Sequence, residues 1–115
     1  MKKLTTAELK RWRDEKSEDF ALFNVLPHQS FEDKRIPGSI SAPVGADDFV
    51  EQVEQTVAGD KSKSVVVYCA NKSCNASPDA ARKLEQAGFT NVFDYEAGIE
   101  AWESAGHEVA TAATR

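Results

Sequence analysis

The sequence predicts a three-layer α/β domain, in which a central parallel sheet of about five strands carries helices on both faces. Short apolar segments alternate along the chain with segments of helical periodicity, and this alternation is typical of parallel sheets. Residues 65–68 are apolar throughout, as expected for a central strand that is covered on both sides. The length of 115 residues indicates one domain over residues 1–115, with its core over residues 4–109.

The first part of the chain predicts a helix, a strand and a helical turn. Thr5 and Glu8 have the spacing of a capping box, in which two side chains satisfy free amides at a helix start. A helix is therefore expected from here to about Lys16. Residues 20–25 are apolar and β-prone, which predicts a buried strand that ends before a short helical turn over residues 28–33.

A tight turn, a brief strand and a second helix are expected next. Pro37 and Gly38 suit the turn, and residues 39–42 then form the strand. Asp47 or Asp48 is expected to cap the helix. The apolar side of this helix recurs at helical spacing and consists of Phe49, Val50, Val53 and Val57.

A third helix is expected after residues 65–68 and a polar loop. Ser77 as its cap and Pro78 at its first position are typical of a helix start, and Gly88 ends it. Its inner face consists of Ala80, Ala81, Leu84 and Ala87.

A strand over residues 91–95 and a last short helix complete the predicted fold. This helix ends at Gly106 and contains Ile99, Ala101 and Trp102. The tail from Glu108 onward is expected to be frayed.

Composition and charge argue against several classes of function. The net charge is −5, whereas a nucleic-acid-binding domain needs a basic surface, so no nucleic acid partner is expected. The chain lacks the run of ~18 apolar residues that a membrane span requires, and its first residues lack the apolar core of a secretory signal. We therefore expect a cytoplasmic protein without a membrane partner, in which both cysteines stay reduced.

Cys69 follows the apolar strand directly. Ligands of parallel sheets bind beyond the carboxyl ends of the strands. Backbone amides of the following loop and the positive end of the next helix favour a thiolate, and Lys72 adds a cation, so these groups are expected to lower the pKa of the Cys69 thiol. The alternative is a small buried side chain without a chemical role.

Three segments of the chain, residues 35–40, 68–102 and 97–102, together resemble the motifs of one protein family. Residues 68–102 contain a strand that ends in a cysteine, then a loop, a helix, a Gly-Phe turn and a strand. Residues 97–102 read Ala-Gly-Ile-Glu-Ala-Trp, and residues 35–40 read Arg-Ile-Pro-Gly-Ser-Ile. The last two are similar to the motifs Gly-Gly-Ile-x-x-Trp and Gly-His-Ile-Pro-Gly-Ala-Ile. Over residues 4–109 the chain thus resembles the rhodanese-like (thiosulfate sulfurtransferase-like) domain family.

The resemblance implies a rhodanese-like fold and a sulfurtransferase that moves sulfane sulfur through a persulfide on Cys69. The donor would be thiosulfate or a persulfide and the acceptor a thiol, with a protein partner in a sulfur relay as a further candidate. No metal and no organic cofactor are implied. Backbone amides from Ala70 to Ala76 would stabilise the anionic persulfide. The implied substrate-binding loop comprises Ala70, Asn71, Lys72, Ser73, Asn75, Ala76 and Ser77.

The sequence departs from the family pattern in two places. The usual loop, Cys-x-x-Gly-x-Arg-Ser, has its Ser six residues after the Cys, whereas Ser77 lies eight residues after Cys69, and neither the Gly nor the Arg is present. The family's Asp-Val-Arg reads Asn-Val-Leu at residues 24–26. These departures favour an alternative function, a non-catalytic or redox-sensing binding module that uses the pair of Cys69 and Cys74.

Cys74 lies five residues after Cys69 in the same loop. Three roles are open for it: a resolving thiol that closes a disulfide with Cys69, the nucleophile itself, or a loop residue that packs in the interior. A zinc site is not expected, because His28 and His107 are distant in sequence and no third or fourth ligand is near the pair.

Phosphatase and arsenate reductase activities are disfavoured. Related phosphatases use Cys-x5-Arg, in which the arginine binds phosphate. Here Asn75 and Ala80 stand six residues after Cys69 and Cys74 respectively.

Overall fold

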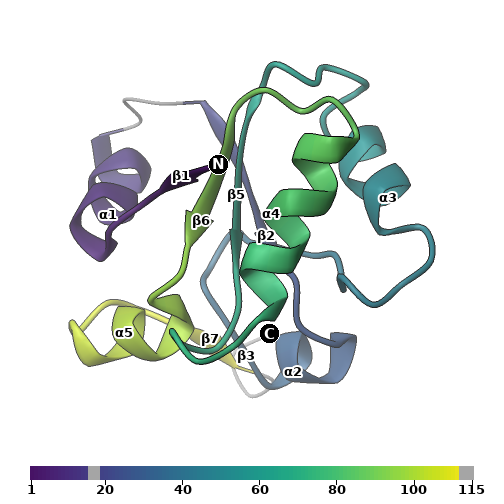
Figure 1. Cartoon of the computed structure of the whole chain (residues 1–115). Coiled ribbons are helices and arrows are strands. Elements are labelled where there is room, and N and C mark those ends of the chain that lie inside the picture. Colours follow the sequence, from purple (N-terminus) through teal and green to yellow (C-terminus); the bar gives the residue numbers. More distant parts are fainter. Residues whose placement is uncertain (16–18, 112–115) are drawn as a thin grey trace.

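The centre of the molecule is a parallel sheet of five strands in the order β1-β6-β5-β2-β4 (Figure 1). The computed structural model describes residues 1–15 and 19–111. β5 lies in the middle of the sheet and is buried at every position, which confirms the predicted fold class and the central place of this strand. The strands are β1 (Lys2–Lys3), β2 (Phe20–Asn24), β4 (Ile40–Ser41), β5 (Ser64–Tyr68) and β6 (Val92–Tyr95).

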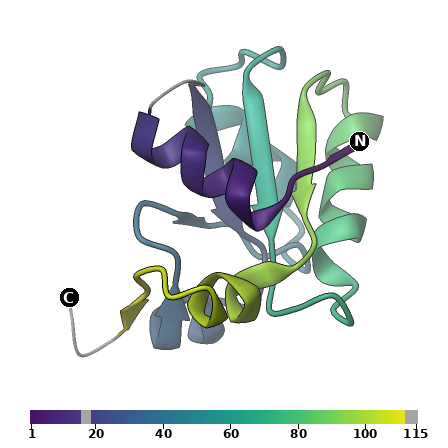
Figure 2. The same ribbon diagram turned by 90° about the vertical axis from the view of Figure 1, so that its left-hand side faces the viewer.

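Helices cover both faces of this sheet (Figures 1 and 2). Successive β5 side chains point to opposite faces. Val65 and Val67 belong to a core that includes residues of α3 and α4, whereas Val66 and Tyr68 belong to a core that includes residues of α1 and α5. Full burial of each valine is worth about 1.5–3 kcal/mol. These helices are α1 (Thr6–Glu15), α3 (Phe49–Thr56), α4 (Ala76–Gln86) and α5 (Gly98–Ser104).

The predicted capping box is present at the start of α1. The Glu8 amide donates to Thr5 Oγ1 (3.1 Å), and the Thr5 amide donates to Glu8 Oε1 (2.9 Å). The helix extends to Glu15, while the predicted end at Lys16 lies outside the described residues. The helical turn after β2 is also confirmed, as α2 (His28–Asp33).

The two predicted helix caps differ from the structure: Asp48 stands at the N-cap position of α3 but makes no capping hydrogen bond, and Ser77 is not the cap of α4. Asp48 precedes α3, but its Oδ1 accepts a hydrogen bond from Gln52 Nε2 (2.9 Å) and caps no backbone amide. α4 begins at Ala76, so Ser77 already lies in the first turn, and its side chain is buried. Pro78 is tolerated there because amides of the first helical turn have no partner within the helix.

Three two-residue strands were not expected from the sequence: β1, β3 (Lys34–Arg35) and β7 (Ala110–Thr111). β7 pairs with β3 in antiparallel orientation, and the Glu108 carbonyl accepts a hydrogen bond from Trp102 Nε1 (2.8 Å). The predicted fraying from Glu108 is therefore wrong as far as Thr111. Residues 112–115 lie outside the described part of the chain.

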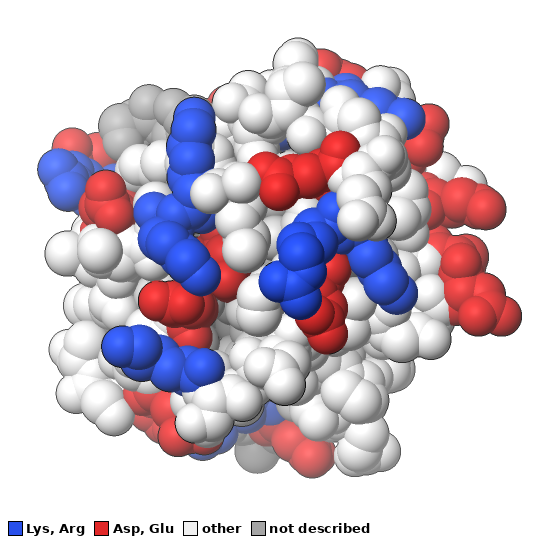
Figure 3. Space-filling model, viewed as in Figure 1, with Lys and Arg blue, Asp and Glu red and all other residues white. Residues whose placement is uncertain are grey.

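The surface facing the viewer in Figure 1 carries both signs of charge. Figure 3 shows lysine and arginine side chains interspersed with aspartate and glutamate side chains over this face. Within the described part of the chain, no helix is long and apolar enough to cross a membrane.

Candidate active site

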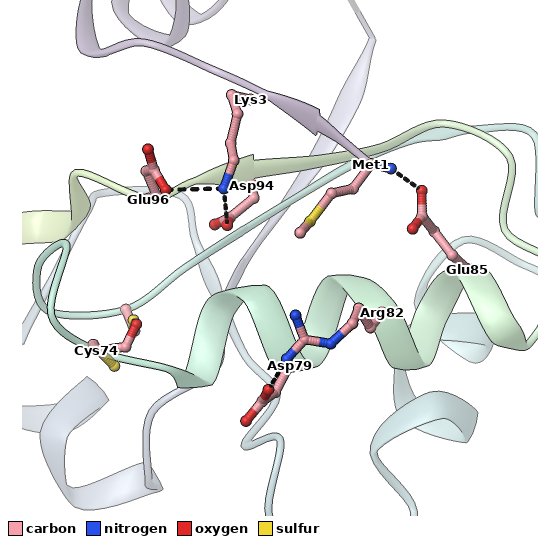
Figure 4. Close-up of polar contacts among 9 residues, drawn as sticks. Met1, Lys3, Cys74, Asp79, Arg82, Glu85, Asp94 and Glu96 are labelled. Carbon is pink, nitrogen blue, oxygen red and sulfur yellow. Dashed lines mark hydrogen bonds and ion pairs between the residues drawn. The ribbon is translucent and has the colours of Figure 1, made fainter.

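Cys69 lies at the carboxyl end of the central strand, where the chain leaves β5 and enters the loop to α4. Cys69 is 0% exposed, whereas Cys74 is partly exposed and lies just before α4 (Figure 4). The Cys69 thiol donates a hydrogen bond to the carbonyl oxygen of Cys74 (3.7 Å). Each thiol also shifts the pKa of the other. The structure thus brings together the two cysteines that the sequence singles out.

The environment of Cys69 favours the neutral thiol. Burial, together with the neighbouring Cys74 thiol, raises the pKa of Cys69 from 9.0 to about 11, although the hydroxyl and amide of Ser77 act in the opposite direction. The expectation that the loop lowers the pKa of Cys69 is therefore wrong for this arrangement. The physical reason is that the loss of hydration on burial outweighs the donors around the sulfur.

The environment of Cys74 favours the thiolate. Partial burial acts to raise the pKa of this thiol, but the Cys69 thiol and the backbone amides of Ala76, Ala70 and Ser77 together lower the pKa below its usual value. The amides at the start of α4 and of the loop therefore outweigh burial at the second cysteine, whereas the Ser77 amide does not outweigh burial at the first.

Asn71 organises the loop between the two cysteines. Its Oδ1 accepts a hydrogen bond from the Ser73 amide (3.0 Å), and its carbonyl oxygen accepts one from the Cys74 amide (3.1 Å). Its Nδ2 donates to Glu100 Oε2 of α5 (2.9 Å). The amides of Ser73 and Cys74 therefore have partners already, so the set of amides around the sulfurs is smaller than expected. An Asn two residues before a loop amide is a signal for such a side-chain turn.

Three of the predicted loop residues lie on the surface. Lys72, Ser73 and Asn75 are exposed. Lys72 interacts with the carboxylate of Glu96. The pKa of Glu96 is lowered mainly by a hydrogen bond from Lys3, and the positive charge of Lys72 adds a smaller effect in the same direction.

An ion-paired cluster lies beside this loop. Lys3 Nζ is 2.9 Å from Glu96 Oε2 and 3.4 Å from Asp94 Oδ2, and it points between the two carboxylates (Figure 4). Asp94 is fully buried, and its Oδ1 has no hydrogen-bond partner among the described residues. Sequence patterns gave no signal for this carboxylate, because it stands at a position of β6 where an apolar side chain is the rule.

The N-terminus of α5 holds the first residues of the loop. The amides of Ile99 and Glu100 donate to the carbonyl oxygens of Cys69 and Ala70, both at 3.0 Å. Gly98 has a φ of +76°, and a Cβ atom at this position would lie 2.5 Å from the carbonyl carbon and oxygen of Ala70. The Gly-Ile-x-x-Trp segment is therefore the support on which the loop after Cys69 rests.

Tyr68 connects the strand before Cys69 to two other segments. Its hydroxyl accepts hydrogen bonds from Asn24 Nδ2 (3.2 Å) and from the Ile36 amide (3.0 Å). Because a hydroxyl has one proton, Tyr68 donates it to Ser39 Oγ (2.8 Å). Asn24 Oδ1 in turn accepts the Leu26 amide (3.0 Å). Asn24, where the family pattern has Asp, is thus a buried link between β2 and the Ile-Pro-Gly turn.

The two histidines take no part in this arrangement. His28 Nδ1 bonds Ser41 Oγ (3.0 Å), and His107 packs against the Trp102 ring at a centroid distance of 4.7 Å. Among the described residues, no three side chains of His, Cys, Asp or Glu gather in a way that could hold a metal ion.

The sequence profile of the Rhodanese-like domain matches residues 5–105 of this chain. The chain belongs to the rhodanese-like domain family. The solution structure of the rhodanese-like domain of an Anabaena protein agrees with this fold at a TM-score of 0.84 and 22% identity, covering 100% of this chain and 83% of that one. The parallel five-stranded sheet and its helices are thus the rhodanese-like fold.

Two curated proteins contain a segment similar to this rhodanese-like chain. The HTH-type transcriptional regulator Rv0324 of Mycobacterium tuberculosis is 33% identical over 105 residues, which is 90% of this chain and 42% of the regulator. The adenylyltransferase and sulfurtransferase UBA4 of Meyerozyma guilliermondii is 27% identical over 93 residues, which is 77% of this chain and 21% of that protein. The chain therefore spans less than half the length of these relatives.

Proposed function

We propose that this rhodanese-like domain is a sulfurtransferase that carries sulfane sulfur as a persulfide on Cys69. The observation that carries the proposal is the pair of thiols at the carboxyl end of β5, beside amides that stabilise a sulfur anion. Membership of the family supports it, and one curated relative bears the name of a sulfurtransferase.

The proposed reaction has two steps. A loop thiolate attacks the outer sulfur of the donor, so that a new S–S bond forms while sulfite or a thiolate leaves with the electron pair of the broken bond. A thiol acceptor then attacks the sulfane sulfur and releases the cysteine thiolate. The position of Cys69 directly after β5 supports its role as carrier, because ligands of parallel sheets bind beyond the carboxyl ends of the strands.

The donor we favour is a persulfide, with thiosulfate as the second choice. The loop lacks the arginine of the family pattern, and Lys72 also interacts with Glu96, so a dianion receives little electrostatic support. We place the reaction in the cytoplasm, where both thiols stay reduced, with a small thiol or a sulfur-relay protein as acceptor.

Intact-mass measurement tests this proposal. After incubation with glutathione persulfide or thiosulfate, the reduced protein should gain one sulfur atom and lose it again on treatment with cyanide. The matched control is the variant with both Cys69→Ala and Cys74→Ala, which should gain nothing. If the wild-type chain gains no sulfur from either donor, the proposed activity is wrong.

A second function, a redox-sensing module, is favoured by the contact between Cys69 and Cys74. A thiol can close a disulfide with a neighbouring cysteine after that cysteine is oxidised to a sulfenic acid. Mild peroxide should then remove two hydrogen atoms from the mass and leave no titratable thiol. Two titratable thiols after peroxide, or a stable sulfenic acid, would exclude the sensor.

A further inference from the structure

We propose that Cys74 is the first acceptor of the sulfur and that it passes the sulfur to Cys69, so that the loop is an internal two-cysteine relay. This inference rests on the proposed sulfurtransferase function and assigns its two steps to different residues.

The first argument is access. Cys69 is 0% exposed, and its thiol proton faces the carbonyl oxygen of Cys74 (3.7 Å). A donor in solution therefore has no direct approach to the Cys69 sulfur in this arrangement. Cys74 lies in the same loop and is partly exposed, so an incoming donor meets Cys74 first.

The second argument is ionisation, since the thiolate is the attacking form. Amides of Ala70, Ala76 and Ser77 stabilise the Cys74 thiolate, and the Cys69 thiol adds a further donor. Asn71 keeps the loop in this form through its bonds to the amides of Ser73 and Cys74. The partly exposed cysteine is thus also the one that is more readily ionised.

The transfer between the cysteines balances without an added oxidant or reductant. The Cys74 thiolate attacks the sulfane sulfur of a persulfide or thiosulfate, and a thiolate or sulfite leaves. The Cys69 proton then moves to the terminal sulfur of the Cys74 persulfide, and the Cys69 thiolate attacks that sulfur. The bond between the terminal sulfur and Cys74 Sγ breaks, and its electron pair restores the Cys74 thiolate.

The difference in pKa between the two thiols favours one direction of transfer. In exchange between sulfurs, the thiol of lower pKa is the better leaving group, and the thiolate of higher pKa is the stronger nucleophile. The pKa of Cys74 lies below its usual value and that of Cys69 lies above it. Transfer from Cys74 to Cys69 is therefore the favoured direction.

The hydroxyl of Ser77 is available as a hydrogen-bond donor beside Cys69, the second cysteine of the relay. Its side chain is 1% exposed, and its Oγ has no hydrogen-bond partner that meets the usual distance and angle criteria among the described residues. Its hydroxyl nevertheless stands close enough to Cys69 to favour negative charge there. A buried hydroxyl without a partner is unusual in folded proteins, and a persulfide on Cys69 would supply an acceptor for it.

The sequence allows the two positions to be separated by trypsin. Cleavage after Lys63, Lys72 and Arg82 places Cys69 in the peptide of residues 64–72 and Cys74 in the peptide of residues 73–82. The reduced chain is mixed with glutathione persulfide for increasing times, trapped with iodoacetamide and digested. The extra sulfur should appear first in residues 73–82 and then accumulate in residues 64–72.

Single variants assign each step. Cys69→Ala should retain the sulfur on Cys74, and Cys74→Ala should slow the labelling of Cys69 by at least about ten-fold. The serine variants of both positions repeat the test, and circular dichroism checks that each variant keeps the wild-type fold.

The outcomes separate the relay from the activity on which it rests. Labelling of Cys69 in Cys74→Ala at the wild-type rate overturns the relay but leaves the sulfurtransferase proposal intact. A wild-type product with a disulfide between Cys69 and Cys74 and free sulfide overturns the transfer step, because Cys69 has then attacked the inner sulfur. Absence of label from the wild type and from both single variants overturns the underlying activity itself.

Discussion

Gly98 packs directly against the backbone of Ala70, at a distance where a methyl group would lie 2.5 Å from the Ala70 carbonyl. This contact joins the last helix to the first residue after Cys69. The neighbouring hydrogen bond from the Ile99 amide to the Cys69 carbonyl oxygen (3.0 Å) fixes the same junction. The conformation of the cysteine loop therefore depends on α5, a helix that lies about thirty residues later in the chain.

Gly98→Ala should destabilise the protein by about 2–4 kcal/mol, because the methyl group meets backbone atoms and the positive φ of +76° disfavours alanine. Gly106→Ala is the matched control. Gly106 has a φ of +85° but nothing within 4 Å of the Cβ position, so it should cost about 1–2 kcal/mol. Urea denaturation measures both. Equal losses would mean that the contact with Ala70 contributes nothing.

Tyr68→Phe should lower the free energy of unfolding by about 2–4 kcal/mol, because the Ile36 amide and Asn24 Nδ2 are left buried without an acceptor. Tyr95→Phe serves for comparison. The Tyr95 hydroxyl shares a single hydrogen bond with Thr6 Oγ1 (2.6 Å), so its loss should cost about 1 kcal/mol. Chemical denaturation of the two variants gives the difference, and a smaller loss for Tyr68→Phe than for Tyr95→Phe would contradict the role of this network.

Asn71→Ala should raise the pKa of Cys74 towards its usual value, because the loop amides lose the side chain that positions them. The pH dependence of iodoacetamide alkylation of the residue 73–82 peptide reports this pKa. Asn75→Ala is the control, since Asn75 precedes α4 without capping it through its side chain. A Cys74 profile in Asn71→Ala that matches the wild type would show that the amides are held by other contacts.

The two thiols should differ in how their alkylation depends on pH. Alkylation follows the thiolate fraction, which rises with pH up to the pKa of each thiol. For Cys74 the rate should level off below pH 9.0, because its pKa is lowered; for Cys69 it should keep rising towards about pH 11, because its pKa is raised. Mass spectrometry of the two tryptic peptides measures each rate, and faster alkylation of Cys69 than of Cys74 at neutral pH would reverse this assignment.

Local patterns in the sequence determine the order of strands and helices and the location of the cysteine loop. Residues 65–68 are apolar throughout and form the central strand, and Cys69 follows that strand as predicted. Thr5 and Glu8 form the capping box that their spacing indicates. These features could be predicted because hydrophobic periodicity and capping depend on residues that are close in sequence.

Tertiary contacts decide the chemistry of the loop. Burial raises the pKa of Cys69, whereas the Cys69 thiol and the amides of Ala76, Ala70 and Ser77 lower the pKa of Cys74. Ser77 was expected at the helix cap but lies buried inside the first turn. The short strands β1 and β7 exist only through pairing with distant segments. The burial of a thiol and the orientation of backbone amides depend on how segments far apart in sequence pack together. The position of Cys69 could therefore be predicted from the sequence, whereas its ionisation state depends on the tertiary structure.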